Sequence, residues 1–328
     1  MARKELVELL SRKKLAVLFL MSLPSVASAA TWYVNPAGGS AGDGSFNSPF
    51  ELIAEAMSAA AVGDSVSLAA GIYSDTVPTT AYGNPRLALM ILKEGVSVVG
   101  AGRGVTILEA LPADTLTFGV TAENVGGSAS VSDLTIRGAC FHGLNLRSSS
   151  PQVKRVDIVN EVTGSSSVSC DVRDLSFPEF EEVLFDGGHT AFVVEFGAGG
   201  VYRNCTVGVR PNEGLICNNA TPEILDTVFL GAGRDVLVFA QGSQPIMNRC
   251  TIADGVRNAV RVAVYLPDSQ IDLSGNTWFS AVPAEVQARI LDASVNPLLG
   301  ATVVFEPFDE GNVSAIPVSF GDVKSRYR

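Results

Sequence analysis

The chain has few of the residues that build metal centres or bind nucleic acids. Its 328 residues include two histidines and no Cys-x-x-Cys pair, so a zinc site is not expected. The 23 Lys and Arg residues are outnumbered by 34 Asp and Glu residues. This balance argues against nucleic acid as a partner, because phosphate binding needs clustered cations. After the N-terminus no apolar run is long enough to cross a bilayer, so the chain is not expected to span a membrane.

The first 29 residues have the three parts of a secretory signal peptide. Basic side chains come first, Leu15–Leu23 form an apolar stretch, and Ala27-Ser28-Ala29 make a small-residue cleavage site. A membrane anchor would need about 20 apolar residues, so this stretch is too short for one. Removing five basic and two acidic residues from 23 and 34 leaves 18 and 32, a net charge of −14. We expect an exported mature chain, either periplasmic or extracellular.

A segment of about 22 residues recurs seven times and is the main structural signal. Each copy centres on a triplet whose third residue is apolar, with another apolar residue three positions before the triplet. The triplets begin at Leu134, Val156, Val183, Cys205, Thr227, Cys250 and Asn276, in steps of 22, 27, 22, 22, 23 and 26 residues. The preceding apolar residues are Val131, Val153, Phe180, Tyr202, Ile224, Met247 and Leu273.

A second apolar strand follows most centres by about ten residues, as in Leu144/Leu146 and Leu237/Phe239. Short strands without intervening helices predict an all-β, single-stranded parallel β-helix, a solenoid of about 22 residues per coil. Leucine-rich repeats have a similar period but need a Leu-x-x-Leu-x-Leu pattern that is absent here. The two longest steps predict loops near residues 161–177 and 254–272, and long insertions often mark the binding side of a solenoid.

Both ends of the solenoid are predicted to be capped, because an open coil exposes apolar surface and unpaired backbone. At the N-terminal end, apolar residues recur at helical spacing from residue 52 to 60, with Ser48 as the expected N-cap and Pro49 in the first turn. A short helix after Pro283, with Val286, Ile290 and Leu291, and a strand over residues 302–305 form the expected C-terminal cap. The solenoid domain is predicted over residues 30–313, followed by a loosely attached tail over residues 314–328.

Five cysteines are an odd number for an oxidising compartment. Cys205 and Cys250 occupy the same repeat position two coils apart, which separates them by about 10 Å at ~4.8 Å per stacked strand. A disulfide tolerates only about 4.4–6.8 Å between Cα atoms, so these two should not pair and are predicted to be core residues. A pair between Cys140 and Cys170 is left open.

Two segments resemble the ends of exported right-handed parallel β-helix proteins of the pectate-lyase-like superfamily. The opening residues that carry the resemblance are Trp32-Tyr33-Val34-Asn35-Pro36, Gly63-Asp64-Ser65-Val66 and Ala69-Ala70-Gly71-Ile72-Tyr73, and the closing ones are Gly275-Asn276-Thr277-Trp278-Phe279 and Asn296-Pro297-Leu298-Leu299-Gly300. The resemblance implies a right-handed helix and export, but no particular activity, because the superfamily includes lyases, hydrolases and binders. The calcium-binding aspartates of family pectate lyases and the motifs of family polygalacturonases are not recognisable here.

Polar residues recur seven or eight positions after the triplets, where stacking should place them along one edge. Together with the preceding turn, this edge is expected to hold His142, Asp186, His189, Glu213, Arg234, Asp235 and Arg257. Carboxylates beside a histidine suit acid–base chemistry on a glycan, which makes Asp186, His189, Glu213 and Asp235 candidate catalytic residues. His142, Arg234 and Arg257 are candidate substrate-binding residues. The same residues would also suit an ordinary exposed turn with solvated ion pairs.

Two functions follow from this pattern. The first is a non-catalytic exported β-helix that binds carbohydrate or another surface component, or serves as a scaffold. The second is a polysaccharide lyase or glycoside hydrolase that uses the polar edge. No cofactor or metal site is predicted, although a calcium requirement stays open. Most of the 16 phenylalanines fall at inward repeat positions, so few exposed aromatic rings are expected beside the edge.

Overall fold

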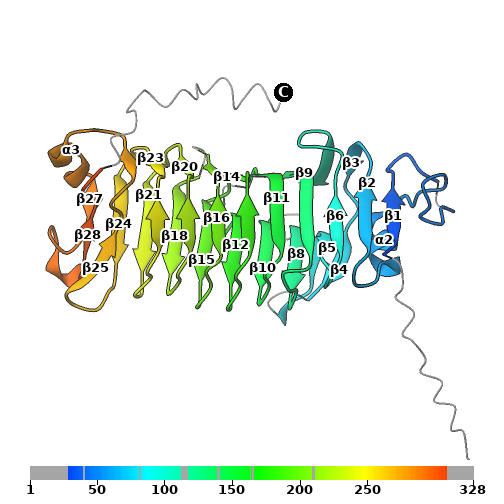
Figure 1. Ribbon diagram of the computed structural model, residues 1–328, viewed down its shortest axis with the longest axis horizontal. Coiled ribbons are helices and arrows are strands. Elements are labelled where there is room, and N and C mark those ends of the chain that lie inside the picture. The colour runs from blue at the N-terminus through cyan, green and yellow to red at the C-terminus, as the bar shows by residue number, and fades with distance from the viewer. Residues whose placement is uncertain are drawn as a thin grey trace, which may run out of the picture.

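Short parallel strands stack along one long axis, with the two ends of the described chain at opposite ends of the stack (Figure 1). The computed structural model describes residues 29–308 except 40, 81–82, 112–116, 139–140, 163, 165 and 209–210. The predicted signal peptide apart from Ala29, the tail over residues 314–328 and Cys140 lie outside the described residues. The architecture is the predicted right-handed parallel β-helix.

Each coil contributes strands to three walls. The first wall contains β1 (Thr31–Val34), β2 (Ser65–Leu68), β6 (Ser97–Val99), β13 (Glu179–Glu181), β16 (Val201–Arg203), β19 (Glu223–Leu225) and β22 (Ile246–Asn248). The second contains β3 (Gly71–Tyr73), β7 (Thr106–Ala110), β14 (Leu184–Gly187), β17 (Thr206–Val207), β20 (Val228–Phe229), β23 (Thr251–Ile252) and β26 (Thr277–Trp278). Two long strands, β9 (Ser130–Gly138) and β11 (Gln152–Asn160), run through both walls.

The third wall is a ten-stranded sheet of longer strands. It contains β4 (Val77–Thr79), β5 (Arg86–Ile91), β8 (Thr117–Glu123), β10 (His142–Arg147), β12 (Val168–Arg173), β15 (Thr190–Glu195), β18 (Glu213–Asn218), β21 (Asp235–Ala240), β24 (Asn258–Ala263) and β27 (Ile290–Leu291). Its strands pair in parallel, apart from the antiparallel pair of β4 and β5 at the N-terminal end. The outward side chains of this wall include the candidate functional residues described below.

The core lies inside the coils and consists of the predicted repeat positions. The third triplet residue and the apolar residue before each triplet are at most 3% exposed in all seven repeats. Aromatic rings stack between neighbouring coils, with the ring centroids of Phe180 and Tyr202 5.0 Å apart, and also within one coil, with those of Phe185 and Phe192 4.8 Å apart. This confirms the predicted register, because a slip of one residue would turn every inward side chain to solvent.

A sharp corner joins the first wall to the second in each of the seven repeats. The residue at this corner has a φ between 51° and 70°, in the left-handed region. The corner residues are Asp133, Arg155, Glu182, Asn204, Asp226, Arg249 and Gly275. Asparagine, aspartate and glycine adopt this conformation most readily, and they fill four of the seven positions.

Helix α2 (Ile53–Ala59) caps the N-terminal end and buries Ile53, Ala56 and Met57 against the first coil. The predicted N-cap at Ser48 is wrong, because the helix begins at Ile53 with Leu52 at the N-cap. The Phe50 N–H donates to the Tyr33 carbonyl and the Phe50 carbonyl accepts from the Asn35 N–H, which holds the chain extended up to Phe50 and delays the helix. The Leu52 N–H then donates to the Glu55 carboxylate, 3.2 Å away.

The C-terminal cap combines a short helix with a small sheet. Helix α3 (Pro283–Gln287) follows the last full coil as predicted, whereas the expected helical residues Ile290 and Leu291 form strand β27. These two residues pair with β24, because they continue the third wall by one strand. The 3₁₀ helix η2 (Pro297–Leu299) leads into β28 (Ala301–Val304), which pairs in parallel with β25 (Ser269–Asp272).

The four described cysteines, Cys170, Cys205, Cys217 and Cys250, are free and buried, so the predicted absence of a Cys205–Cys250 bond is confirmed. Burial raises the pKa of the Cys250 thiol from 9.0 to about 11 and that of Cys205 to about 12. A buried thiol therefore keeps its proton in the folded protein at a pH where the unfolded chain has lost it. These cysteines behave as small apolar core residues.

We expect Trp278→Ala to lower the free energy of unfolding by roughly 3–5 kcal/mol, because the indole is 2% exposed and packs against Phe305 at the last coil. Urea unfolding of the mature protein measures this loss. The matched control is Leu298→Ala, whose side chain is 89% exposed, and which should change stability by less than about 0.5 kcal/mol. Equal stability of the two variants would contradict the inward packing of Trp278.

We expect stability to fall as the pH rises above 9. Below the pKa of a thiol in the unfolded chain, the thiol is protonated in both the folded and the unfolded state. Above that pKa only the unfolded state ionises. Each buried thiol therefore lowers the free energy of unfolding by up to about 1.4 kcal/mol per pH unit until its folded-state pKa is reached. For Cys250 this window runs from 9.0 to about 11. Cys250→Ala should show a shallower decline in unfolding free energy across that window than the parent or a Thr251→Ala control. Parallel declines in all three proteins would rule out this linkage.

Candidate functional site

The outward face of the third wall carries a column of residues at the start of its strands. Pairing in register places Thr190 beside Glu213, Glu213 beside Asp235, and Asp235 beside Asn258. Glu213 and Asp235 therefore lie on adjacent strands, about 4.8 Å apart along the stack. The repeat offset predicted this neighbourhood from the sequence.

Six residues around these two carboxylates form what we call the Glu213–Asp235 cluster: His189, Glu213, Arg234, Asp235, Asn258 and Arg261. The Glu213 carboxylate lies 3.3 Å from His189 Nε2 and 3.2 Å from an Arg234 terminal nitrogen. Arg234 also reaches towards Asp235, at 3.9 Å. One cation thus bridges the two carboxylates and offsets their mutual repulsion.

Asp235 has the densest set of partners in the cluster. Its carboxylate accepts hydrogen bonds from Asn258 Nδ2 at 2.6 Å and from Arg261 Nε at 2.7 Å. The Asp235 side chain is fully buried, and the Glu213 side chain is 4% exposed. By contrast, Arg234 is 40% exposed and Arg261 is 27% exposed. The carboxylates therefore lie beneath the cations, and solvent meets guanidinium groups first.

His189 and Arg257 lie at the margin of this cluster. The His189 side chain is 25% exposed, and its Nδ1 lies 3.1 Å from Asn212 Nδ2. Arg257 is exposed in the turn before β24, and its backbone N–H donates to the carbonyl of Arg234. Both residues are accessible to a ligand that lies over the cluster.

Asp186 lies on another wall. It belongs to β14, is 2% exposed, and has its carboxylate against Gly208 of the next coil, where a Cβ would lie 2.1 Å from Oδ1. Its backbone carbonyl accepts a hydrogen bond from Ser169 Oγ. The sequence analysis assigned Asp186 and His189 to the same edge because they are close in the sequence. The corner between β14 and β15 instead puts Asp186 on the second wall, whereas His189 lies at the start of the third.

His142 lies in a second group of polar residues, three coils before Glu213. In this Asp171 cluster, His142 Nδ1 is 3.2 Å from the Asp171 carboxylate and 3.4 Å from Asn145 Oδ1. Arg173 binds Asp171 at 2.8 Å and also pairs with Glu195. Asp171 is fully buried, like Asp235. The candidate edge therefore consists of two separate clusters.

Sequence reasoning missed Asp171, Arg173 and Glu195. The available signal was the strand Ser169-Cys170-Asp171-Val172-Arg173, whose alternation turns Asp171 and Arg173 outward. Burial raises the pKa of Glu195, and the neighbouring Arg173 guanidinium offsets only part of that rise. The side chains at the level of Asp171 in the next three coils are Val193, Ile216 and Val238, which lie between the two clusters.

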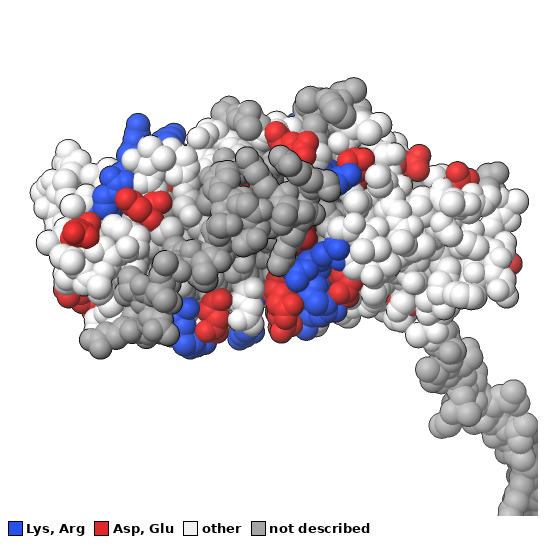
Figure 2. All heavy atoms as spheres, turned by 90° about the horizontal axis from the view of Figure 1, so that it is seen from above, with Lys and Arg blue, Asp and Glu red and all other residues white. Residues whose placement is uncertain are grey.

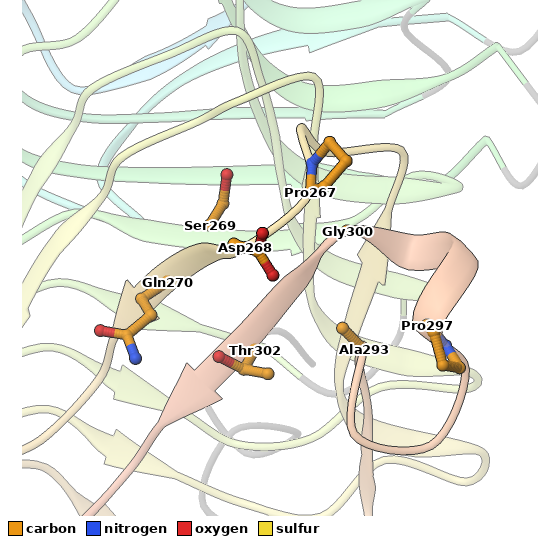
Figure 3. Close-up of a pocket in the computed structure, with 8 residues that line it drawn as sticks. All are labelled: Pro267, Asp268, Ser269, Gln270, Ala293, Pro297, Gly300 and Thr302. Carbon is orange, nitrogen blue, oxygen red and sulfur yellow. The ribbon is translucent and has the colours of Figure 1, made fainter.

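A cavity of about 400 Å³ lies away from both clusters, at the C-terminal cap. Its lining residues come from β25, β28, η2 and the adjoining turns (Figure 3). They are Pro267, Asp268, Ser269, Gln270, Ala293, Pro297, Gly300 and Thr302. The first four belong to the second lengthened repeat.

Charges of both signs are interspersed on the face shown in Figure 2, which has no broad area of one sign. Within the described residues there is no group of three or more His, Cys, Asp and Glu side chains placed to hold a metal ion. In the same part of the chain no helix is long and apolar enough to cross a membrane.

Several solved structures share this fold. Pectate lyase Pel9A aligns over 87% of this chain and 79% of its own, with a TM-score of 0.54 and 14% identity. ORF18 of Geobacillus virus E2 aligns over 83% of this chain and 60% of its own, with a TM-score of 0.55 and 14% identity. A rhamnogalacturonan lyase aligns over 74% of this chain and 72% of its own, with a TM-score of 0.50 and 13% identity.

No protein-family model matches the chain, and no curated protein sequence matches it. At these identities the structural likeness shows the fold alone. The chain therefore has the parallel β-helix fold that these solved structures share.

We expect Asp235→Ala to lower the free energy of unfolding by about 3–5 kcal/mol, because it leaves the Arg261 guanidinium and the Asn258 amide without their buried partner. Asp226→Ala is the matched control, since Asp226 also accepts two hydrogen bonds, both from Arg249, but is 38% exposed. The control should cost less than about 1 kcal/mol. Chemical denaturation of both variants checks the difference, and similar losses would mean that burial does not govern the Asp235 pairs.

Proposed function

We propose that this chain is an exported, non-catalytic carbohydrate-binding β-helix whose ligand lies over the Glu213–Asp235 cluster. The observation that carries the proposal is the order of burial in that cluster. Its two carboxylates are buried and paired, while the side chains of Arg234, Arg261 and His189 are partly exposed, at 40%, 27% and 25%. A general acid or base must reach the proton that it transfers, whereas hydrogen-bond donors at the surface suit recognition of sugar oxygens.

The fold supports a polysaccharide ligand in a more general way. The structural neighbours described above include a pectate lyase and a rhamnogalacturonan lyase, named for their action on polysaccharides. A flat sheet face offers length for an extended chain, and the outward residues of neighbouring coils repeat about every 4.8 Å. The N-terminal sequence pattern supports export, to the periplasm or beyond the cell.

The alternative is a polysaccharide lyase or glycoside hydrolase. The observation that favours it is the juxtaposition of Glu213 and Asp235 on adjacent strands, with His189 3.3 Å from Glu213. In this alternative, ligand binding would have to draw Arg234 away from the carboxylates before either could act. Binding and turnover therefore separate the two functions.

The test is a glycan-array and polysaccharide-degradation screen of residues 30–328, with and without calcium. We expect binding without product release. Arg234→Gln should weaken binding about 10–100-fold, because a hydrogen bond to a charged group contributes about 1.5–3 kcal/mol. The control Arg155→Gln changes an arginine at the corner of the first two walls and should bind like the parent. Product release that Glu213→Gln or Asp235→Asn abolishes would establish the enzyme instead.

A further inference from the structure

Three apolar side chains are exposed together where the third wall turns into the first. They are Leu175, Phe177 and Phe196, which are 68%, 50% and 48% exposed. Leu175 and Phe177 follow β12, and Phe196 follows β15 in the next coil. We call these three residues the aromatic platform.

Glycines of the neighbouring coil let the platform lie close to the backbone. A Cβ at Gly197 would lie 2.9 Å from the Leu175 side chain, and one at Gly199 would lie 3.2 Å from the Phe177 ring. The Leu175 N–H donates to the Phe196 carbonyl, which fixes the two coils in register. The three platform residues therefore lie on two adjacent coils that pack closely together.

Folding alone does not account for these residues. Leu175 and Phe196 have φ values of 61° and 56°, in the left-handed region that bulky side chains disfavour. The left-handed residues at the same turn in other coils are polar at Asn124, Ser148, Asn219 and Gln241, and apolar at Val264. Exposed apolar residues in a strained conformation gain little burial energy, and such outliers cluster at binding sites.

Hydrogen-bonding groups border the platform on the side of the third wall. The Arg173 guanidinium carbon lies 5.7 Å from the centre of the Phe196 ring. The same guanidinium binds Asp171 and Glu195, so the platform continues into the Asp171 cluster. An aromatic face beside paired charged groups is complementary to a sugar ring, which has an apolar C–H face and hydroxyls at its rim.

The size of the platform favours a small ligand over a protein partner. A stable protein interface buries about 800 Å² on each side. The platform offers three side chains, and its flanking turns contain Ser148, Ser150 and Asn219. Such an area matches one or two sugar rings.

We propose that the aromatic platform is a sugar-stacking subsite that binds one or two pyranose rings of a glycan. Arg173 donates hydrogen bonds to the hydroxyls of these rings, and Glu195 accepts hydrogen bonds from them. The proposal rests on the proposed function and extends it, since it locates a second contact region at the opposite end of the strands. Six residues of β15 at about 3.3 Å each separate the two ends of the wall by about 20 Å. The ligand is therefore an oligosaccharide of several units.

Phe196→Asn tests the subsite without adding strain, because Asn219 occupies the corresponding position in the next coil. We expect calorimetric titration with the hexasaccharides of glucose, xylose and galacturonate to show at least tenfold weaker binding for the sugar that the parent binds. The melting temperature should stay the same or rise. The matched control is Val264→Asn, at the same turn further along the stack, with a φ of 53° and 72% exposure; its binding should equal that of the parent.

Hydrogen exchange of the parent with the same hexasaccharide provides a second readout, and residues 171–199 should become protected. Parental affinity in Phe196→Asn, together with weaker binding in Arg234→Gln, would overturn the subsite and leave the proposed function standing. A parent that binds none of the glycans in the screen would overturn both. Loss of binding in the Val264→Asn control as well would also overturn the subsite, because the effect would then not be specific to the platform.

Discussion

Every coil of this protein buries its apolar face only against the coils before and after it, so the structure depends on an unbroken parallel register. Inward residues, corner residues and outward columns all follow from that register. The left-handed corner between the first two walls returns the chain to the same position in each of the seven repeats, from Asp133 to Gly275. Because a one-residue slip would reverse the inward and outward faces, a single register determines both the core and the surface chemistry. Caps at both ends, α2 and the β25–β28 pair, protect the first and last coils.

The same register arranges charge on the third wall in layers. Buried carboxylates such as Asp171 and Asp235 lie closest to the sheet and pair with partly exposed arginines, Arg173 of the same strand and Arg261 of the neighbouring strand. A buried carboxylate needs such partners, because an unpaired charge in that position would be very costly. The pairing fixes the guanidinium groups in place at the surface. The third wall therefore has rigid hydrogen-bond donors in the Asp171 cluster and in the Glu213–Asp235 cluster, with apolar residues such as Ile216 between the two clusters.

Much of this fold could be predicted from the sequence, because the repeat reports inward positions directly. Phe180, Tyr202 and Trp278 are buried where their spacing placed them. The ion-pair partners could not be predicted, since they depend on which strands are adjacent and on side-chain length. His142 shared an offset with Glu213 and was assigned to the same edge, but two intervening coils put it in another cluster. Phe177 and Phe196 lie in turns, where no periodicity distinguishes an exposed ring from a buried one.

The charged corner residues also give the coils a fixed order. Asp133 pairs with Arg155 of the next coil, and Asp226 pairs with Arg249. Deleting the single coil that begins at Arg155 would bring Asp133 next to Glu182 at the same corner. Like charges would then replace an ion pair, although the apolar core would still match. A gene rearrangement that removes this coil would thus replace an attraction by a repulsion at the surface, a small penalty of at most about 1 kcal/mol that favours the present order of coils.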